Sequence, residues 1–366
     1  MLRKLPRLAL FTTFLGSGGA ERVTVNLAKG FRDHGLEVDL VLTRFGPQQY
    51  EIPSGVRLIN IGAPRIYAAL PGIIRYLRQV QPDIVLSAEA AVNVTVLLAW
   101  RLSGSRARIF VAEHNSRIEA TKNSRDWRVK LLPVFIRKTY PWTDGIVAVS
   151  KGAADQLAKI APIVKHKIRV IYNPVVSEEL FVKAEQPLNH PWFCKGEPPV
   201  ILAAGRLIFQ KDFTTLIRAF ALVRKKRPAR LMILGEGKDR AHLEALVRKL
   251  GLEEDVALPG FVENPYKYMK RASVFVLSSR WEALPTVLIE AMACGCPVVS
   301  TDCPSGPAEI LENGKWGRLV PIHSPELLAK AILETLERPI YATERAKYFS
   351  LERATQEYLR FLGVVK

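Results

Sequence analysis

RLALFTTFLGSGGAERVTVNLAKGFRDHGLEVDLVLT, residues 7–43, decides the fold of this chain. It opens on an apolar run, passes through three glycines and continues as a predicted helix at 20–31, in which Val23, Leu27 and Phe31 share one face. A second apolar run follows at 36–43. A strand, a helix and a strand in this order form a βαβ unit, whose two strands lie parallel in one sheet.

The same alternation continues on both sides of a polar, proline-rich stretch. The apolar runs DIVLSA, RIFVAEH and GIVAVS precede KAEQPLNHPWFCKGEPP, and VILAAGR, ARLMILGEG and SVFVLSS follow it. The four prolines of that stretch disfavour both a helix and a central strand. We therefore predict an α/β protein with two Rossmann-like, doubly wound domains at 1–180 and 199–345, a linker at 181–198, and a C-terminal helix at 346–366 that packs back on the N-terminal domain.

The composition is that of a globular protein too long for one core, with 366 residues, 48% hydrophobic and 24% charged. The four cysteines form neither a CxxC pair nor a set with histidines, so we expect buried thiols in a reducing compartment. The first 20 residues imitate a signal peptide, but they lead through glycines into an amphipathic helix, which favours a first core strand. The other apolar stretches are shorter than the roughly 20 residues of a membrane span, so a soluble or peripheral protein is expected.

Positive charge is concentrated in the first half of the chain. Residues 1–190 hold 27 Lys and Arg residues against 15 Asp and Glu residues. This half is therefore expected to meet an anionic surface, either nucleic acid or lipid headgroups. The chain lacks interleaved aromatic residues and any recognisable nucleic-acid-binding module, so no nucleic-acid partner is predicted.

The loop LGSGGAERV follows the first predicted strand. Gly16, Gly18 and Gly19 let backbone amides approach a ligand, and the N-terminus of the next helix favours an anion at the same place. A dinucleotide site would need an acidic residue at the end of the second strand, where Thr43 and Arg44 stand instead. A tight turn without a ligand remains the other interpretation.

Two loops of the second half carry groups that suit phosphates. In AAGRLIFQKDF, Arg206 and Lys211 lie five apart at a strand-to-helix junction and can converge on neighbouring phosphates. In TDCPSGPAEIL, Ser305 and Gly306 offer a hydroxyl and an unobstructed amide before a short helix. The alternatives are two unrelated surface cations and a proline-stiffened turn.

The segment RWEALPTVLIE carries two glutamates eight apart. Glu282 is expected in the loop after a strand and Glu290 about a turn and a half into the following helix, where both can serve a polyhydroxylated ligand. The alternative is a helix capped by one acid with a second acid on its face. His114 ends a strand in the first half, a position better suited to a site than most, although a lone histidine is more often structural. The chain has no DxD and no HExxH, so no metal is predicted.

These motifs resemble those of glycosyltransferase family 4, the retaining GT-B enzymes. The resemblance lies in GRLIFQKDFTTLIRAF, LMILGEG, LPGFVEN and SSRWEALPTVLIEAMACGCPVVSTDCPSGPAEIL, whose E-x7-E pair is Glu282 and Glu290. GSGGAERVTVNLA, AEHNS and AVSKGAADQL extend it over nearly the whole chain. It implies a GT-B fold, in which two Rossmann-like domains face each other across a cleft. The N-terminal domain, residues 1–180, would bind the acceptor, and the C-terminal domain, residues 199–345, would bind the nucleotide-sugar donor.

The resemblance also implies roles for the site residues. Arg206 and Lys211 would bind the donor diphosphate, Glu290 would bind the ribose hydroxyls, and Glu282 would contact the transferred sugar near its anomeric carbon. His114 would position that sugar from the opposite domain, the loop at Gly18 and Gly19 would close over the diphosphate, and backbone near Phe261 and Val262 would contact the base. Many members have glycine where this chain has Ala283, and the additional methyl group would tighten the donor pocket.

The expected activity is therefore a retaining, metal-independent transfer of a hexose or N-acetylhexosamine to an acceptor hydroxyl. DCPSGPAEIL resembles members that use UDP-linked sugars to extend lipid-linked glycans, so we expect a UDP-sugar as co-substrate, no cofactor, and a lipid-linked or surface glycan as acceptor. The protein would act at the inner, cytoplasmic face of the cell membrane as a peripheral protein. The alternative is a catalytically silent module that binds sugar nucleotides or membranes.

The basic segment SRDWRVKLLPVFIRKTY, residues 124–140, is the candidate membrane contact. Its basic and apolar residues interleave at near-helical spacing, and Pro133 either kinks the helix or starts a second one. An interfacial helix on an anionic leaflet would use Arg125, Trp127, Arg128 and Lys130. The alternative is an ordinary domain helix with a solvated basic face.

Overall fold

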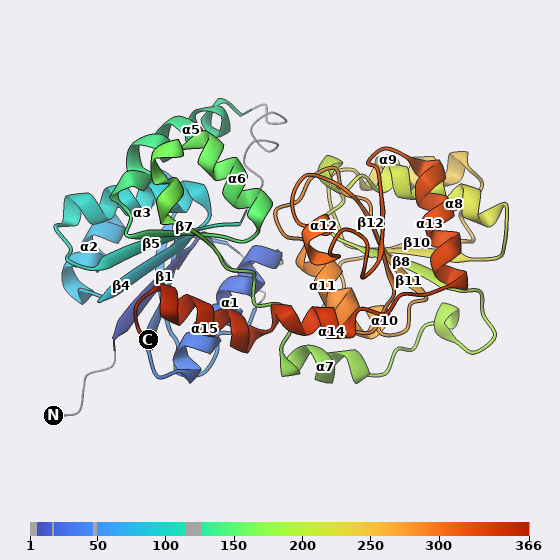
Figure 1. The fold of residues 1–366 in the computed structure, drawn as a ribbon, viewed down its shortest axis with the longest axis horizontal. Helices are drawn as coiled ribbons and strands as arrows, with labels where there is room; N and C mark the ends of the chain where they lie inside the picture. Colours follow the sequence, from blue (N-terminus) through green and yellow to red (C-terminus); the bar gives the residue numbers. More distant parts are fainter. Residues whose placement is uncertain (1–5, 17, 47–49, 115–125, 366) are drawn as a thin grey trace. The chain divides into compact units, whose positions relative to one another are not determined.

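The computed structural model describes residues 6–16, 18–46, 50–114 and 126–365, and it divides the chain into two compact units (Figure 1). Unit 1 comprises residues 1–174 and 351–366, and unit 2 comprises residues 175–350. Each unit contains one parallel sheet with helices packed on it. The predicted fold class, α/β with two Rossmann-like domains, is confirmed.

The boundaries of the units differ from those that the proline-rich stretch predicted. The segment 181–198, expected to be a linker, lies inside unit 2 and contains the end of helix α7 (Glu178–Glu185) and the short helix η4 (Pro191–Phe193). Leu180 and Ala184 of α7 are buried, and α7 packs against helix α10 (Tyr266–Met269), so side-chain packing attaches the first part of this segment to unit 2. The C-terminal helix is α15 (Leu351–Phe361), which belongs to unit 1.

Unit 1 has a seven-stranded sheet in the order β3-β2-β1-β4-β5-β6-β7. Its strands are β1 (Arg7–Thr12), β2 (Glu37–Arg44), β3 (Arg57–Ala63), β4 (Ile84–Ala88), β5 (Arg108–Glu113), β6 (Gly145–Ala148) and β7 (Ile168–Val170). All neighbouring strands are parallel, with Leu10 of β1 in register with Leu40 of β2 and Leu86 of β4. β3 was not predicted, because this edge strand lacks the continuous burial of the central strands.

Helices cover both faces of this sheet. They are α1 (Gly19–Asp33), α2 (Leu70–Val80), α3 (Ala90–Ser103), α5 (Trp127–Thr139), α6 (Lys151–Ile160) and α15, with short helices η1 (Ile66–Ala69), η2 (Tyr140–Trp142) and η3 (Pro162–Lys167). Alternate residues of β1 point to opposite cores: Ala9 and Phe11 pack with α2 and α3, whereas Leu8 and Leu10 pack with α1 and α15. The aromatic rings of Phe31 in α1 and Tyr358 in α15 meet edge to face at 6.0 Å.

Unit 2 has a six-stranded parallel sheet in the order β10-β9-β8-β11-β12-β13. Its strands are β8 (Val200–Ala204), β9 (Arg230–Leu234), β10 (Val256–Gly260), β11 (Val274–Leu277), β12 (Val298–Thr301) and β13 (Arg318–Val320). Its further helices are η5 (Phe209–Lys211), α8 (Phe213–Arg224), α9 (Arg240–Lys249), α10 (Tyr266–Met269), α11 (Thr286–Ala293), α12 (Pro307–Ile310), α13 (Pro325–Glu337), α14 (Thr343–Ala346) and η6 (Lys347–Phe349). β8, β9 and β11 share one core with α8, α9 and α13.

Candidate active site

The predicted donor-binding and catalytic residues of each unit lie in the segments that follow the carboxyl ends of its strands. In a doubly wound sheet the ligand lies outside these ends, at the point where the strand order reverses. In unit 2 that point lies between β8 and β11, and in unit 1 between β1 and β4. The loop after β8 carries Arg206 and Lys211, and the loop after β11 carries Glu282.

Lys211 and Glu282 form an ion pair at the reversal point of unit 2. Lys211 Nζ lies 2.5 Å from Glu282 Oε1, which also accepts a hydrogen bond of 2.6 Å from the Ser279 hydroxyl. Their side chains are only 16% and 9% exposed. Removing either partner of such a buried pair should destabilise the protein, because the remaining charge would be buried without compensation. The family resemblance implies contacts of the two residues with different parts of the donor, and no motif indicates that they contact each other.

Further hydrogen bonds join the loops that carry this pair. The Gln210 amide donates to the Trp281 carbonyl at 2.9 Å, and the Arg280 N–H donates to the Gln210 carbonyl at 2.8 Å. The Ser278 hydroxyl donates to the Lys211 carbonyl at 2.8 Å. These bonds fix the backbone on both sides of the Lys211–Glu282 pair.

Asp212 is a supporting residue that the sequence analysis did not identify. It is buried, and its φ of 47° lies in the left-handed region. Its carboxylate accepts a hydrogen bond from Arg280 Nη2 at 3.1 Å, and its other oxygen lies 3.0 Å from His323 Nδ1. The Arg280 guanidinium in turn lies over the Phe209 ring, 3.8 Å from its centroid. Asp212 thus ties the loop after β8 to the loops after β11 and β13.

Arg206 differs from Lys211 in its surroundings. It is exposed, and its guanidinium has no ion pair or hydrogen bond with any residue in the part of the chain that the structure describes. Its charge is therefore available to a ligand, whereas the charge of Lys211 is shared with Glu282. Both belong to the short connection between β8 and α8, as predicted.

Glu290 lies in α11 and is almost wholly buried. Its negative charge adds to burial in raising the pKa of the Cys294 thiol to about 12. Burial also raises the pKa values of Cys296 and Cys303, so all three thiols are protonated at neutral pH. The predicted buried thiols are thus found at these positions, but the prediction is wrong for Cys194, which is exposed in the proline-rich surface segment.

Ser305 and Gly306 form a strained turn beside the Glu282 loop. Their φ angles are 67° and 92°, and a Cβ on Gly306 would lie 2.6 Å from Pro285 Cδ and 3.0 Å from the Ala283 carbonyl oxygen. Only glycine allows this approach. Glu282 N–H donates to the Pro304 carbonyl at 3.3 Å, so the turn and the glutamate loop are joined.

Phe261 and Val262 directly follow β10, on the same edge of the sheet. Phe261 is 55% exposed, which is unusual for its side chain and leaves its ring open to a ligand. The loops that follow the unit 2 strands therefore carry most of the predicted donor residues, whereas Glu290 lies inside α11.

In unit 1, Gly18 and Gly19 lie at the start of α1, as the sequence predicted. Gly18 is the N-cap residue, and its carbonyl accepts hydrogen bonds from the Arg22 N–H and the Tyr50 hydroxyl, both at 3.2 Å. A Cβ on Gly18 would lie 2.2 Å from a carboxylate oxygen of Glu21, so the side chain of any other residue would displace that group.

His114 follows β5 directly and is partly buried. The residue before it, Glu113, is turned into the core, where its carboxylate accepts a hydrogen bond from the Tyr140 hydroxyl. The Asn93 amide donates to the same carboxylate oxygen at 3.3 Å and to the Ala112 carbonyl at 2.9 Å. This buried network holds the end of β5 and thereby the backbone of His114.

The basic segment forms one helix, α5, that continues through Pro133 and does not break into two. Arg125 lies outside the described residues, and only the backbone of Arg128 is described. Trp127, Leu131, Val134 and Phe135 are 43–63% exposed, whereas Ile136 is fully buried. These four apolar side chains therefore face away from the core, and Ile136 lies on the side of α5 that packs into it.

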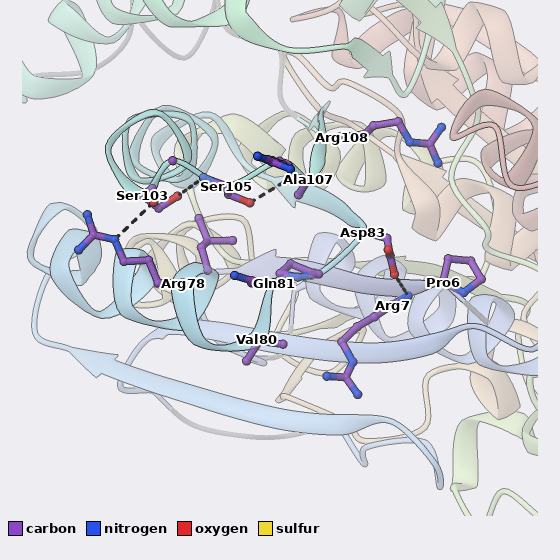
Figure 2. A pocket seen from close by; sticks show the side chains of 14 residues that line it. Pro6, Arg7, Arg78, Val80, Gln81, Asp83, Ser103, Ser105, Ala107 and Arg108 are labelled. Atoms are coloured by element: carbon purple, nitrogen blue, oxygen red, sulfur yellow. Dashed lines mark hydrogen bonds between the residues drawn. The ribbon is translucent and has the colours of Figure 1, made fainter. Parts of the chain in front are cut away.

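A cavity of about 880 Å³ lies on the opposite edge of the unit 1 sheet (Figure 2). Arg7, Arg78, Arg106 and Arg108 line it, together with Asp83. Arg78 donates to the carbonyls of Leu102 and Ser103 at the end of α3, at 3.2 and 3.3 Å, and so caps that helix. This cavity is at the amino ends of the strands and contains none of the predicted site residues.

The described residues form neither a metal-binding cluster nor a membrane-spanning helix. No three or more His, Cys, Asp or Glu side chains among them are grouped so that they could hold a metal ion. None of the helices in the described ranges is both long and apolar enough to cross a membrane.

Comparison with known proteins gives two family matches that together span most of the chain. Residues 17–179 match the family described as Glycosyltransferase Family 4, and residues 189–351 match Glycosyl transferases group 1. A Campylobacter jejuni protein is 31% identical over 98% of this chain and all of its own length; it is named N-acetylgalactosamine-N,N'-diacetylbacillosaminyl-diphospho-undecaprenol 4-alpha-N-acetylgalactosaminyltransferase. The Rhizobium meliloti lipopolysaccharide core biosynthesis glycosyltransferase LpsE is 27% identical, over 94% of this chain and 96% of its own.

A solved structure shares the fold. Anabaena HepE in complex with UDP and glucose superposes with a TM-score of 0.79 at 19% identity, and the match covers 98% of this chain and 100% of HepE. The predicted GT-B fold is thereby confirmed.

Proposed function

The chain belongs to the glycosyltransferases of family 4 and group 1, and on this premise we propose that it moves a hexose or N-acetylhexosamine from a UDP-sugar to a hydroxyl of a lipid-linked or surface glycan. The observation that carries the proposal is the Lys211–Glu282 pair, with Arg206 on the same loop, at the reversal point of the unit 2 sheet. The alternative is a catalytically silent module that binds the sugar nucleotide.

The charges of this edge suit a donor diphosphate. Arg206 is exposed and has no counter-charge among the described residues, so it can meet a phosphate without first losing another partner. Lys211 is held by Glu282 and would share its charge between that carboxylate and the diphosphate. Two cations close to the departing phosphates offset the charge that develops as the sugar leaves.

The remaining donor contacts are proposed from the resemblance to family 4 and from the anion-binding character of the turn at Ser305 and Gly306. Phe261 and Val262 would contact the base, Glu290 the ribose hydroxyls, and Ser305 and Gly306 a phosphate or sugar hydroxyl. A UDP-linked donor is supported by the HepE complex with UDP and glucose. An N-acetylhexosamine is supported by the name of the Campylobacter relative, whose lipid-diphosphate acceptor also supports a lipid-linked acceptor here.

The proposed mechanism retains the configuration at the anomeric carbon. The bond from this carbon to the diphosphate oxygen breaks, the acceptor oxygen bonds to the carbon from the same face, and the proton of the acceptor hydroxyl passes to the departing diphosphate. Glu282 would stabilise the positive charge that develops on the sugar, and Lys211 and Arg206 would stabilise the negative charge on the leaving group. His114 would help to position the sugar.

Hydrolysis of UDP-sugars without an acceptor tests whether the chain is an enzyme or a silent module. The enzyme should release UDP from at least one UDP-hexose or UDP-N-acetylhexosamine above the uncatalysed rate. Thermal stabilisation by a UDP-sugar without any release of UDP, with or without an acceptor, would favour the silent module.

Metal independence gives a separate prediction. Because cationic side chains are proposed to neutralise the diphosphate, adding EDTA to purified enzyme should change kcat and KM for the donor by less than twofold. Titration with Mg²⁺ or Mn²⁺ after chelation is the control. A large loss on chelation that either ion restores would show that a metal takes part.

We also propose that the outer face of α5 binds the anionic lipids of the cytoplasmic leaflet of the cell membrane. Trp127, Leu131, Val134 and Phe135 expose their side chains at the spacing of one helix face. The exposed Lys130 and Lys138 flank this stripe, and Arg125 and Arg128 are proposed to add charge. Apolar side chains next to lysines are the composition of interfacial helices that bind anionic lipids.

Liposome co-sedimentation checks this surface. Changing Lys130 and Lys138 to glutamine should weaken binding to phosphatidylglycerol vesicles by about 10- to 30-fold, since each basic residue near such a surface contributes about 1 kcal/mol. Changing Trp127 and Phe135 to serine should weaken it as well. The matched control changes Arg75 and Arg101, exposed on α2 and α3, to glutamine and should bind normally. The membrane role would be wrong if the protein bound neutral vesicles as well as phosphatidylglycerol vesicles. It would also be wrong if the control variant lost as much binding as the Lys130 and Lys138 variant.

A further inference from the structure

Glu89 stands in a backbone conformation that a non-glycine residue rarely adopts. It follows β4 directly, with φ of 78° and ψ of 126°. Glycine would adopt this conformation without strain. A strained residue of another type is therefore typical of positions where the side chain has a function. Glu89 is also the N-cap residue of α3, yet its side chain makes no capping hydrogen bond. Helix capping therefore does not explain the residue.

The hydrogen bonds that fix the Glu89 carboxylate all end on one of its two oxygens. Oε1 accepts hydrogen bonds from the Thr13 hydroxyl at 2.9 Å, the Thr12 hydroxyl at 3.3 Å and the Thr13 N–H at 3.4 Å. Among the described residues, no group donates to Oε2 and no Lys, Arg or His forms an ion pair with Glu89. The side chain is thus fixed in place and partly exposed, and within the described ranges its Oε2 has no donor and its charge has no cationic partner.

The place of Glu89 in the fold matches that of Glu282. In unit 1 the order β2-β1-β4-β5 reverses between β1 and β4, and in unit 2 the order β9-β8-β11-β12 reverses between β8 and β11. Glu89 follows β4 and Glu282 follows β11, so each carboxylate lies after the strand on the same side of the reversal point. The partners differ, because Glu282 pairs with a lysine and Glu89 with two threonines.

Because Glu89 pairs with threonines and not with a lysine, it suits a neutral ligand that donates hydrogen bonds. A carboxylate without a counter-charge repels phosphate and accepts hydrogen bonds from hydroxyl or amide N–H groups. The donor diphosphate suits the cations of unit 2 instead. The neighbouring acid at this edge, Glu113, is turned into the core and engaged by Tyr140 and Asn93, so it does not compete for the same role.

We propose that Glu89 binds the acceptor, with Oε2 accepting a hydrogen bond from a hydroxyl or acetamido N–H of the sugar that receives the transferred residue. The proposal rests on the transferase function above. It adds Glu89 to the residues that recognise the acceptor, with Thr12 and Thr13 as positioning residues.

The test measures transfer to undecaprenyl-diphosphate-linked N-acetylhexosamine acceptors by wild type, Glu89→Gln and Glu89→Gly. KM for the acceptor should rise roughly 10- to 100-fold in both variants, as expected for loss of a hydrogen bond to a charged group. UDP affinity and UDP-sugar hydrolysis without acceptor should stay within twofold. The Glu89→Gly protein should melt at or above the temperature of wild type, because it relieves the backbone strain.

Gln81→Gly is the matched control. Gln81 also has a positive φ, 48°, but lies at the end of α2 on the opposite edge of the sheet, so the change should leave acceptor KM unaltered. Acceptor KM within twofold of wild type in both Glu89 variants would overturn the proposal. A loss of acceptor-free hydrolysis as large as the loss of transfer would also overturn it, because it would indicate a structural role for Glu89. If wild-type protein shows neither hydrolysis nor transfer, the proposed function itself fails. That failure is seen in the wild-type protein, whereas failure of the Glu89 proposal is seen only in the variants.

Discussion

Replacing Glu282 with glutamine should lower kcat for transfer by about 100- to 1,000-fold, the loss typical when one electrostatic stabiliser of a transition state is removed. Glutamine keeps the size of the side chain and a carbonyl oxygen for Ser279 and Lys211, but it removes the negative charge that would face the anomeric carbon. Because that contact strengthens only as the sugar becomes positive, the loss should appear in kcat and not in affinity. Steady-state kinetics together with calorimetric titration of UDP measure both quantities.

Glu290→Gln is the matched comparison for this prediction. Glu290 is proposed to hold the ribose, which is bound equally in the ground state and the transition state, so its loss should mainly raise KM for the donor. If the two glutamine variants gave the same changes in kcat and KM, the division of roles between Glu282 and Glu290 would be wrong.

Replacing Lys211 with alanine should have two effects at once. UDP affinity should fall roughly 10- to 100-fold, because a charge-assisted contact to a diphosphate is worth about 1.5–3 kcal/mol. The variant should also lose about 3 kcal/mol of stability, because Glu282 would stay buried without its counter-charge. Calorimetric titration measures the first effect and chemical denaturation the second.

Two further variants separate these effects. Arg206→Ala removes a cation from the same loop, but Arg206 is exposed and unpaired among the described residues, so UDP affinity should fall without loss of stability. The double variant Lys211→Ala, Glu282→Gln should recover most of the lost stability while remaining inactive. If Lys211→Ala and Arg206→Ala both bound UDP within twofold of wild type, the diphosphate assignment would be wrong.

The sequence was sufficient to predict most of the strands and the loops that carry the site. The strands β1 and β8 within RLALFTTF and VILAAGR are almost entirely buried, and glycines follow both strands in the connections to α1 and α8. This pattern is enough to locate the carboxyl ends of the strands and therefore Arg206, Lys211 and Glu282. β3 and β13 escaped prediction because they are partly exposed and, in β13, only three residues long.

The contacts within the site could not be predicted, because they join residues far apart in the chain. Lys211 and Glu282 are 71 positions apart, and Asp212 and His323 are 111 apart. Glu89 gives no signal in the sequence, since its importance lies in a backbone angle and in the two threonines of another strand. Helical spacing in α5 indicated an apolar stripe but could not tell which side of the helix faces the sheet.

The measurement that tests the central claim most directly is mass spectrometry of products. Purified protein is incubated with each UDP-hexose and UDP-N-acetylhexosamine and with an undecaprenyl-diphosphate-linked N-acetylhexosamine acceptor. We predict that one donor yields a product heavier than the acceptor by one sugar residue, with an equal amount of UDP released, and that Glu282→Gln nearly abolishes both. An acceptor of unchanged mass with every donor, from a protein that still binds UDP, would contradict the assignment as a UDP-sugar transferase of lipid-linked glycans.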